Sequence, residues 1–249
     1  MKKENAKAEW LYGFNPVLEA IKSGRKIKTV YISKQRHEQV QKIIELAKAE
    51  GIRIEFAERD FFDTRFHKGH QGIAAVVEQK GLLTIDELLT IPEKRKELAF
   101  FLILDLIEDP RNFGAILRVA DASGVHGVVF QHHRSAGITP VVSKASAGAL
   151  EYVNLAEVVN IKHAIDKMKR LNIMIVGAEA GSELTPWDID MKEPMAFVIG
   201  SEGQGLRKTV REMCDFVVSL PMRGMVNSLN VSVAAGILVY EVIRQRLGR

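Results

Sequence analysis

Cysteine is almost absent from this sequence: Cys214 is the only one among 249 residues. A single cysteine excludes an internal disulfide and any zinc site built on several thiolates, and it favours a reducing, cytoplasmic location. The chain also lacks an apolar run of about 18 residues, so we expect no transmembrane helix. Its basic N-terminus, MKKENAKAEW, has no apolar stretch of the kind found in secretory signals.

A strong excess of one charge is missing as well. The chain has 35 lysines and arginines against 31 aspartates and glutamates, a net charge of +4, and its pI is about 9.1. This mild excess is compatible with a nucleic-acid partner but does not require one. The length of 249 residues is enough for one large domain or two smaller ones, and a hydrophobic content of 47% is enough to build a core.

Residues 10–80 have the pattern of a small α/β domain that follows a flexible tail over residues 1–9. The first helix is expected to begin with Asn15 as its N-cap and Pro16 in its first position, and to stop at Gly24. The alternation of apolar residues and the flanking glycines predict further strands at 27–33, 52–56 and 72–78 and a helix at 39–51.

The second part, residues 98–249, predicts a larger α/β domain, joined to the first by a linker over residues 81–97. It opens with LAFFLILDL, an apolar run typical of a strand buried on both faces. Strands and helices then alternate, which predicts a mainly parallel sheet with helices on both faces. The last helix, expected from about residue 229, is apolar on most sides and should lie in a core or a subunit interface. Ligands bind such sheets in the loops after the carboxyl ends of strands.

The first loop of interest, DLIEDPRNFGAILRVADASG, follows a strand that ends at Asp105. Arg118 lies in the helix that comes next, with glycine and alanine at neighbouring helical positions that leave space around a guanidinium. A simpler interpretation makes Asn112 a helix cap and pairs Arg118 with Asp121 on the surface. The pattern alone leaves both interpretations open.

The second loop, FVIGSEGQGLRK, places three glycines around Glu202 after a buried strand. Their order is G-x-x-G-x-G, which is neither the dinucleotide-binding order nor a phosphate-binding P-loop. Glycines still allow backbone N–H groups to approach a ligand closely. The acidic Glu202 disfavours a phosphate and suits a cationic or hydroxyl-rich ligand, although a simple tight turn would also explain the loop.

The third loop, LPMRGMVNSLNVSVAAG, leads into the last helix and contains Asn227, Ser228 and Asn230. Asn227 or Ser228 would serve as a normal N-cap. Capping needs one such residue, however, and we expect Asn230 to lie inside the first turn without a capping role. The surplus of polar side chains therefore indicates a second purpose.

Together these loops resemble the three motifs of the SpoU (TrmH-type) RNA ribose 2′-O-methyltransferases of the SPOUT superfamily. The matching segments are DPRNFGAILRVADASGV, FVIGSEGQGL and LPMRGMVNSLNVSVAAGI, with RSAGITPVVSKASAGALE between them. YGFNPVLEAIKSG and KGHQGIAAVVE are similar to the family's small RNA-binding domain, which has a ribosomal-protein-like fold. The resemblance covers nearly the whole chain and is nearest to the 23S rRNA guanosine-2′-O-methyltransferase branch.

The resemblance implies a fold and a set of partners. The catalytic domain, residues 98–249, would contain a deep trefoil knot, an exception to the rule that chains do not thread themselves. It would form a homodimer through this domain, act on RNA and use S-adenosylmethionine, without a metal. Matched residue by residue, the cofactor-binding positions are Gly200, Leu220 and Leu229 with Ile199 and Met222 beside them, and the catalytic positions are Arg118, Asn112, Glu202, Asn230 and Ser228.

The implied reaction transfers a methyl group from a sulfonium to a ribose 2′-hydroxyl. A guanidinium, with a pKa of about 12 or above, is a poor base. We therefore expect Arg118 to orient the ribose-phosphate and stabilise the developing alkoxide. Methylation at C5 of a base is disfavoured because it needs a cysteine nucleophile, and Cys214 lies in a helix-to-strand connection where packing is the expected role.

Three basic residues are candidate phosphate contacts: Arg134 in QHHRSAG, and Arg25 and Lys26 in KSGRKIK. A solvated charged face is the alternative for the second group. The paired His132 and His133 lack an evident third ligand, so no metal site is predicted. A tRNA ribose methyltransferase and a non-catalytic RNA-binding ribosome-assembly factor on the same scaffold remain alternatives, since RNA targets are selected by shape and loop context.

Overall fold

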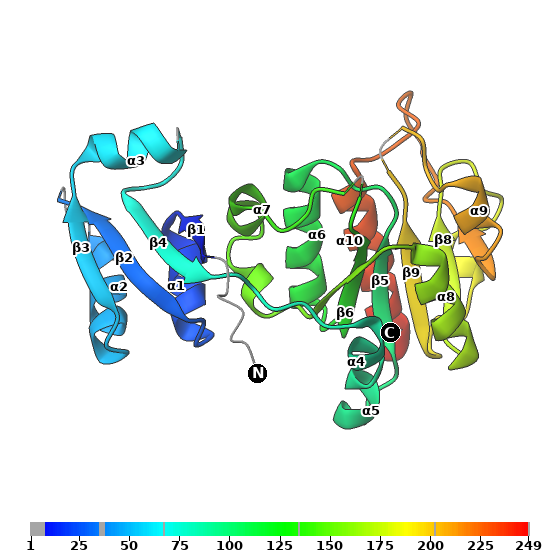
Figure 1. The fold of residues 1–249 in the computed structure, drawn as a ribbon. Helices are drawn as coiled ribbons and strands as arrows, with labels where there is room; N and C mark the ends of the chain where they lie inside the picture. The colour runs from blue at the N-terminus through cyan, green and yellow to red at the C-terminus, as the bar shows by residue number, and fades with distance from the viewer. Residues whose placement is uncertain (1–7, 35–37, 67, 134, 202, 249) are drawn as a thin grey trace. The chain divides into compact units, whose positions relative to one another are not determined.

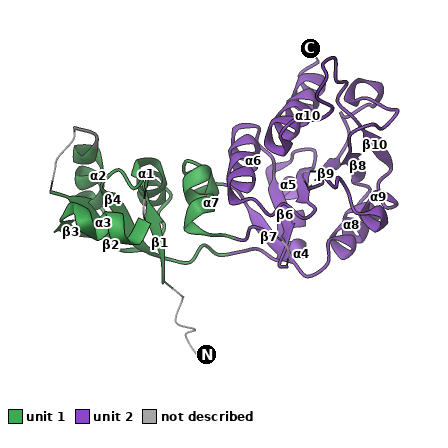
Figure 2. Ribbon diagram, turned by 90° about the horizontal axis from the view of Figure 1, so that it is seen from above, with its two compact units in different colours: residues 1–81, 138–152 green, residues 82–137, 153–249 purple. Residues whose placement is uncertain are grey.

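The computed structural model describes residues 8–34, 38–66, 68–133, 135–201 and 203–248. The chain divides into two units, residues 1–81 with 138–152 and residues 82–137 with 153–249 (Figure 2). Within the described ranges, no helix is long and apolar enough to cross a membrane.

The first unit is built on a four-stranded sheet in the order β1-β4-β2-β3. β4 pairs antiparallel with β1 and β2, and β2 pairs parallel with β3. Alternate residues of the strands pack against α1 and α2 in an aliphatic core, as their period of two requires. The elements are β1 (Ala8–Tyr12), α1 (Phe14–Lys22), β2 (Ile27–Ser33), α2 (Glu38–Ala49), β3 (Arg53–Ala57), α3 (Arg59–Phe66), β4 (Ile73–Glu78), α7 (Pro140–Ala145) and η1 (Ala149–Glu151).

Two details of this unit differ from the sequence prediction. α1 begins at Phe14 with Gly13 as its N-cap, so the assignment of Asn15 as the cap is wrong. Gly13 has a φ of 96°, a conformation that favours glycine over asparagine. Ala8 and Glu9 belong to β1 instead of a tail, because β1 is completed only by pairing with the distant β4.

The second unit contains a six-stranded sheet in the order β10-β8-β9-β5-β6-β7, with every pairing parallel. This confirms the predicted parallel sheet with flanking helices (Figure 1). The elements are α4 (Ile85–Leu89), α5 (Ile91–Arg95), β5 (Phe100–Leu104), α6 (Pro110–Ala122), β6 (Gly127–Gln131), β7 (Leu155–Val158), α8 (Ile161–Arg170), β8 (Met174–Ala178), η2 (Pro186–Asp188), β9 (Met195–Ile199), α9 (Lys208–Arg211), β10 (Phe216–Val218) and α10 (Val231–Arg246).

The segment interpreted as a linker is mostly part of this second unit. Thr84 and Glu87 form a capping box at the start of α4. Leu88 is fully buried, and its side chain occupies the space where a Cβ on Gly127 would lie. Leu83 also forms an isolated parallel bridge with Ala156. Residues 138–152, predicted as part of the second domain, belong instead to the first unit.

The sheet order creates a place for a ligand. β6 and β7 lie on one side of β5. The later strands lie on its other side, with β9 directly against β5 and β8 beyond β9. In open parallel sheets, ligands bind at the carboxyl ends of the strands where the order reverses. The loops that follow β5 and β9 meet there, and they carry two of the three motifs.

His126, at the opposite end of the sheet, gives the fold a pH dependence. Nδ1 accepts the Phe100 N–H at 3.2 Å and Nε2 donates to Glu97 Oε2 at 2.9 Å, so the ring is neutral. Burial lowers the pKa of His126 below its ordinary value of 6.5, against the opposing effect of Glu97. The unfolded chain therefore binds this proton more readily.

We expect the free energy of unfolding to fall as the pH drops below about 6.5, because the unfolded His126 protonates first. Urea unfolding at pH 7.5 and 5.5 would measure the loss, and His126→Gln should show a smaller one. An equal loss in the variant would contradict this assignment.

Candidate active site

The loop after β9 is folded back on itself so tightly that glycine is required at its start. Ser201 and Gly205 exchange two backbone hydrogen bonds of 3.1 and 3.0 Å. A Cβ on Gly200 would lie 2.4 Å from both the carbonyl carbon and the oxygen of Gly205. The loop thus presents its backbone with no side chain at the point of closest approach.

A buried ion pair anchors the end of this loop. Asp105, fully buried after β5, accepts from the Arg207 backbone N–H at 3.0 Å and from Arg207 Nε at 2.7 Å. Arg207 Nη2 also donates to Gln131 at 2.9 Å, so the ends of β5 and β6 share one guanidinium. A buried carboxylate is tolerated only when it is paired in this way. The sequence reasoning missed this pair, although an aspartate ending an apolar strand was a usable signal.

A cavity of about 540 Å³ lies between the ends of β8, β9 and β10 and the start of α10. Its volume falls in the usual range for small-molecule sites, roughly 300–1,000 Å³. Glu179, which the sequence analysis did not single out, lines it and accepts from Arg211 Nε at 2.6 Å. All five predicted cofactor positions line the same cavity: Ile199, Gly200, Leu220, Met222 and Leu229.

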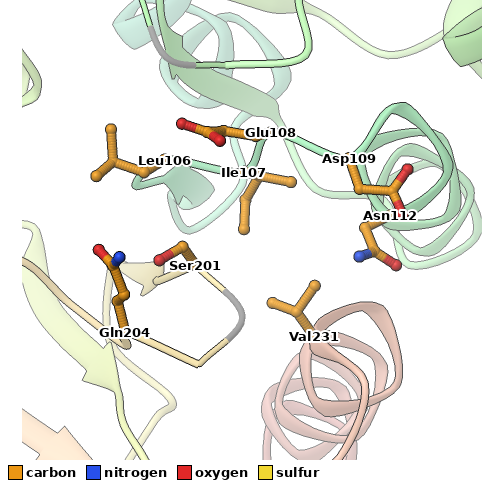
Figure 3. A pocket seen from close by; sticks show the side chains of 8 residues that line it. All are labelled: Leu106, Ile107, Glu108, Asp109, Asn112, Ser201, Gln204 and Val231. Carbon is orange, nitrogen blue, oxygen red and sulfur yellow. The ribbon is translucent and has the colours of Figure 1, made fainter.

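A smaller cavity of about 250 Å³ adjoins the first and shares Ser201, Gln204 and Val231 with it. Figure 3 shows this second cavity, with Asn112 projecting from α6 and Val231 from α10 toward the loop after β9. The remaining lining residues follow β5: Leu106, Ile107, Glu108 and Asp109.

Asn112 and Asn230 join the first and third motifs. Asn230 Nδ2 donates to Asn112 Oδ1 at 2.9 Å, across 118 positions of sequence. Asn112 is not the cap of α6, because Asp109 fills that role. Asn230 is the N-cap of α10, its Oδ1 accepting the Ser232 N–H at 2.9 Å, so the prediction that it has no capping role is wrong. The Asn230 side chain therefore caps α10 with its oxygen and donates a hydrogen bond to Asn112 with its nitrogen.

The other predicted catalytic residues do not take part in the hydrogen bond between Asn112 and Asn230. Ser228 lines the larger cavity, as does Asn227. Arg118 is exposed on α6 and lines neither cavity, and the structure gives no support for its pairing with Asp121 within the described part of the chain. Glu202 lies outside the described residues.

The three candidate phosphate contacts have different outcomes. Arg25 is committed within the first unit: its side chain is 7% exposed and donates to Glu9, to Glu151 at 2.7 Å and to the carbonyl of Glu78 at 3.0 Å. The prediction that it meets phosphate is therefore wrong. The Lys26 side chain is 80% exposed and lies 3.4 Å from a Glu78 carboxylate oxygen, so its contact with phosphate stays a prediction. Arg134 lies outside the described residues.

Cysteine and metal chemistry have no support at this site. Burial raises the pKa of Cys214 to about 11, which keeps the thiol protonated at neutral pH. His132 contacts Glu157 at 3.0 Å. In the part of the chain that the structure describes, no three histidine, cysteine, aspartate or glutamate side chains converge on a metal position.

Comparisons with known proteins agree with this geometry. The SpoU rRNA methylase family model matches residues 99–240, and the model for RNA 2′-O ribose methyltransferase substrate binding matches residues 10–82. The chain is 43% identical over 239 residues to YacO of Bacillus subtilis (strain 168), assigned to the TrmH family of tRNA/rRNA methyltransferases, with 96% of each chain covered. It is 40% identical over 243 residues to the 23S rRNA (guanosine-2′-O-)-methyltransferase RlmB of Coxiella burnetii, with 97% of each covered.

Solved structures show the same relationship. The SpoU methyltransferase AviRb from Streptomyces viridochromogenes, in complex with the cofactor AdoMet, superposes with a TM-score of 0.82 at 26% identity. The superposition covers all of this chain and 95% of that one. From the motifs, the parallel sheet and these matches, the chain belongs to the SpoU rRNA methylase family and is an S-adenosylmethionine-dependent RNA 2′-O-methyltransferase.

Proposed function

We propose that this protein methylates the ribose 2′-hydroxyl of a guanosine in 23S rRNA. The observation that carries the catalytic part is the Asn112–Asn230 hydrogen bond, which joins the first and third motifs where the two cavities meet. The rRNA part is supported by the 40% identity to RlmB over nearly the full length of both chains. A cytoplasmic location is part of the same proposal.

The larger cavity fits S-adenosylmethionine. Gly200 has no side chain to cover the backbone of the loop after β9, and the backbone at Leu220 and Leu229 lines the same cavity. Such a cradle suits a ligand held by backbone N–H and C=O groups. When bound, the cofactor supplies an activated methyl group. Ile199 and Met222 provide apolar contact.

The smaller cavity is the proposed ribose site. Asn112 and Asn230 hold each other, and Ser228 lies on the wall of the adjoining cavity, so polar groups surround the junction where the hydroxyl would meet the methyl group. Positioning two reactants in line supplies much of the rate in such transfers. Arg118 lines neither cavity of its own chain, so in this proposal it enters the site of a second copy and stabilises the alkoxide that forms there as the hydroxyl loses its proton. Glu202 would orient that arginine or the ribose.

A homodimer through the catalytic unit would bring more groups to this site. α10 exposes Val233, Ile237 and Tyr240, spaced to lie along one side of the helix. Met225 and Val226 of the third-motif loop are exposed too. These apolar side chains suit a second copy of the chain, which light scattering would detect. The trefoil knot also stays a prediction, carried by the family resemblance.

Mapping ribose 2′-O-methyl groups in rRNA and tRNA from cells with and without the gene tests the function. Loss of one guanosine methyl in 23S rRNA is the expected result. Loss of a tRNA ribose methyl group would instead identify the protein as a tRNA ribose 2′-O-methyltransferase. No change in either RNA, together with no binding of S-adenosylmethionine by the purified protein, would favour a non-catalytic RNA-binding factor.

Two substitutions of Asn230 separate its structural role from its proposed catalytic role. Asn230→Ala should remove the cap and cost about 1 kcal/mol, which lowers Tm by roughly 2–4 °C. Asn230→Ser should keep the cap but lose the donor to Asn112, so Tm stays near the wild-type value while methyl transfer falls about 5- to 100-fold. Thermal melts and methylation rates measure the two effects. Full activity in Asn230→Ser would show that the amide pair only shapes the fold.

A further inference from the structure

The sheet of the first unit has a second face that differs in chemistry from the first. The face against α1 and α2 is aliphatic, with no aromatic among its fully buried members. The opposite face carries Trp10 and Tyr12 from β1 and Tyr31 from β2, because side chains alternate along a strand. Phe56 of β3, which pairs with Ile32, is the exception among the aromatic residues of these strands.

The register of β4 brings these rings together. Ala74 lies between Tyr12 and Tyr31, and Val76 lies opposite Trp10. These small side chains of the middle strand let rings from both neighbouring strands meet across it. The ring centroids of Trp10 and Tyr31 are 5.4 Å apart.

α3 extends the cluster from one side (Figure 1). Phe61 stacks on Tyr31 at 4.9 Å, and Phe66 stacks on Tyr12 at 4.9 Å. Both also meet Trp10 edge-on, at 6.1 and 5.6 Å. We call the five rings Trp10, Tyr12, Tyr31, Phe61 and Phe66 the aromatic surface. Every one of them is half-buried, so each side chain keeps some solvent-accessible area beside its stacked neighbours.

Two cations border the aromatic surface. The Arg65 guanidinium lies 4.2 Å from the centre of the Phe61 ring, and Lys144 Nζ lies 5.2 Å from the centre of the Tyr12 ring. Neither forms an ion pair with a carboxylate of the described residues; the acceptor recorded for Lys144 is the carbonyl of Lys68 at 3.4 Å. Burial lowers the pKa of Lys144, as expected for an ammonium held without a counter-charge.

Partly exposed aromatic rings, beside cations that have no carboxylate partner in the described part of the chain, match the chemistry of a single-stranded nucleic acid. Unpaired bases stack on aromatic side chains, and neighbouring lysine and arginine residues meet the phosphates. A base inside a duplex offers no free face for stacking. We propose that the aromatic surface binds unpaired nucleotides of the RNA substrate by stacking, with Arg65 and Lys144 meeting the adjacent phosphates. This proposal rests on the proposed function as an RNA methyltransferase.

Trp10 is a built-in reporter for this binding. The chain has two tryptophans, and the other, Trp187, is 55% exposed in the second unit. In the full-length Trp187→Phe protein, a short single-stranded oligoadenylate should quench the fluorescence of Trp10 in a saturable manner. The same strand without bases, and a duplex of equal length, should bind much more weakly and leave the emission unchanged.

Substitutions then separate stacking from charge. Tyr31→Leu and Phe61→Leu should each weaken oligoadenylate binding about 5- to 100-fold, whereas Tyr31→Phe should retain it. Phe14→Leu is the matched control, because Phe14 packs against the aliphatic core on the other face. Lys144→Gln should reduce the salt dependence of binding, and Lys48→Gln, exposed on α2, should not.

Equal binding of the strand without bases, or unchanged affinity in Tyr31→Leu and Phe61→Leu proteins with wild-type melting curves, would overturn the proposal. Cofactor binding and methyl transfer are measured separately in the same proteins. An active methyltransferase without stacking would refute this inference alone. Stacking without methyl transfer would refute the proposed function alone.

Discussion

Arg118→Ala is expected to abolish methyl transfer while leaving the affinity for S-adenosylmethionine nearly unchanged. Arg118 lines neither cavity and is exposed on α6, so its removal should not disturb the cofactor site. It also forms no ion pair with another described residue whose loss would destabilise the fold. If it stabilises the developing alkoxide, its loss should lower kcat by at least about 100-fold. Single-turnover methylation and calorimetric titration of the cofactor measure the two quantities.

Arg170→Ala is the matched control, since Arg170 is exposed at the end of α8 in the same unit. It should change neither quantity. A large loss of cofactor binding in Arg118→Ala would contradict the catalytic role, and so would a wild-type rate of methyl transfer. A change in KM for RNA without a change in kcat would instead make Arg118 a substrate-binding residue.

The three motif loops could be located from the sequence because each of them is local. A glycine-rich turn after a buried strand, and small polar residues before an apolar helix, each define their own conformation within about ten positions. The parallel sheet brings the ends of its strands to one edge, so three such loops converge there. The five cofactor positions themselves came from the family resemblance, and all of them line the larger cavity: Ile199, Gly200, Leu220, Met222 and Leu229.

Side-chain interactions between residues far apart in the sequence could not be predicted. The role of Asp105 could not be predicted because its partner, Arg207, lies 102 positions away in the sequence. Arg25 looked like a free cation in a basic stretch, but Glu151, 126 positions away, neutralises it. Asn230 looked internal to a helix because the helix boundary could not be fixed to within one residue, and it is the cap itself.

Gly200→Ala is expected to weaken the binding of S-adenosylmethionine about 100-fold. The added Cβ would lie 2.4 Å from the carbonyl carbon and oxygen of Gly205. Both contacts are with backbone, so no side-chain rotation relieves them. The two hydrogen bonds between Ser201 and Gly205 would have to break, and the loop would open at the wall of the larger cavity. Overlap in a packed site costs up to about 3 kcal/mol, which corresponds to a loss of roughly 100-fold in affinity.

Calorimetric titration of S-adenosylmethionine into Gly200→Ala measures this loss, and a thermal melt tests whether the fold survives. The Asp105–Arg207 ion pair fixes the far end of the loop and does not depend on Gly200, so we expect a folded protein with a defective site. Gly81→Ala is the control, because nothing lies within 4 Å of a Cβ at that exposed position. Unchanged cofactor affinity in Gly200→Ala would mean that the loop binds the ligand in a more open form than the one observed, and that backbone contact at Gly200 is not required.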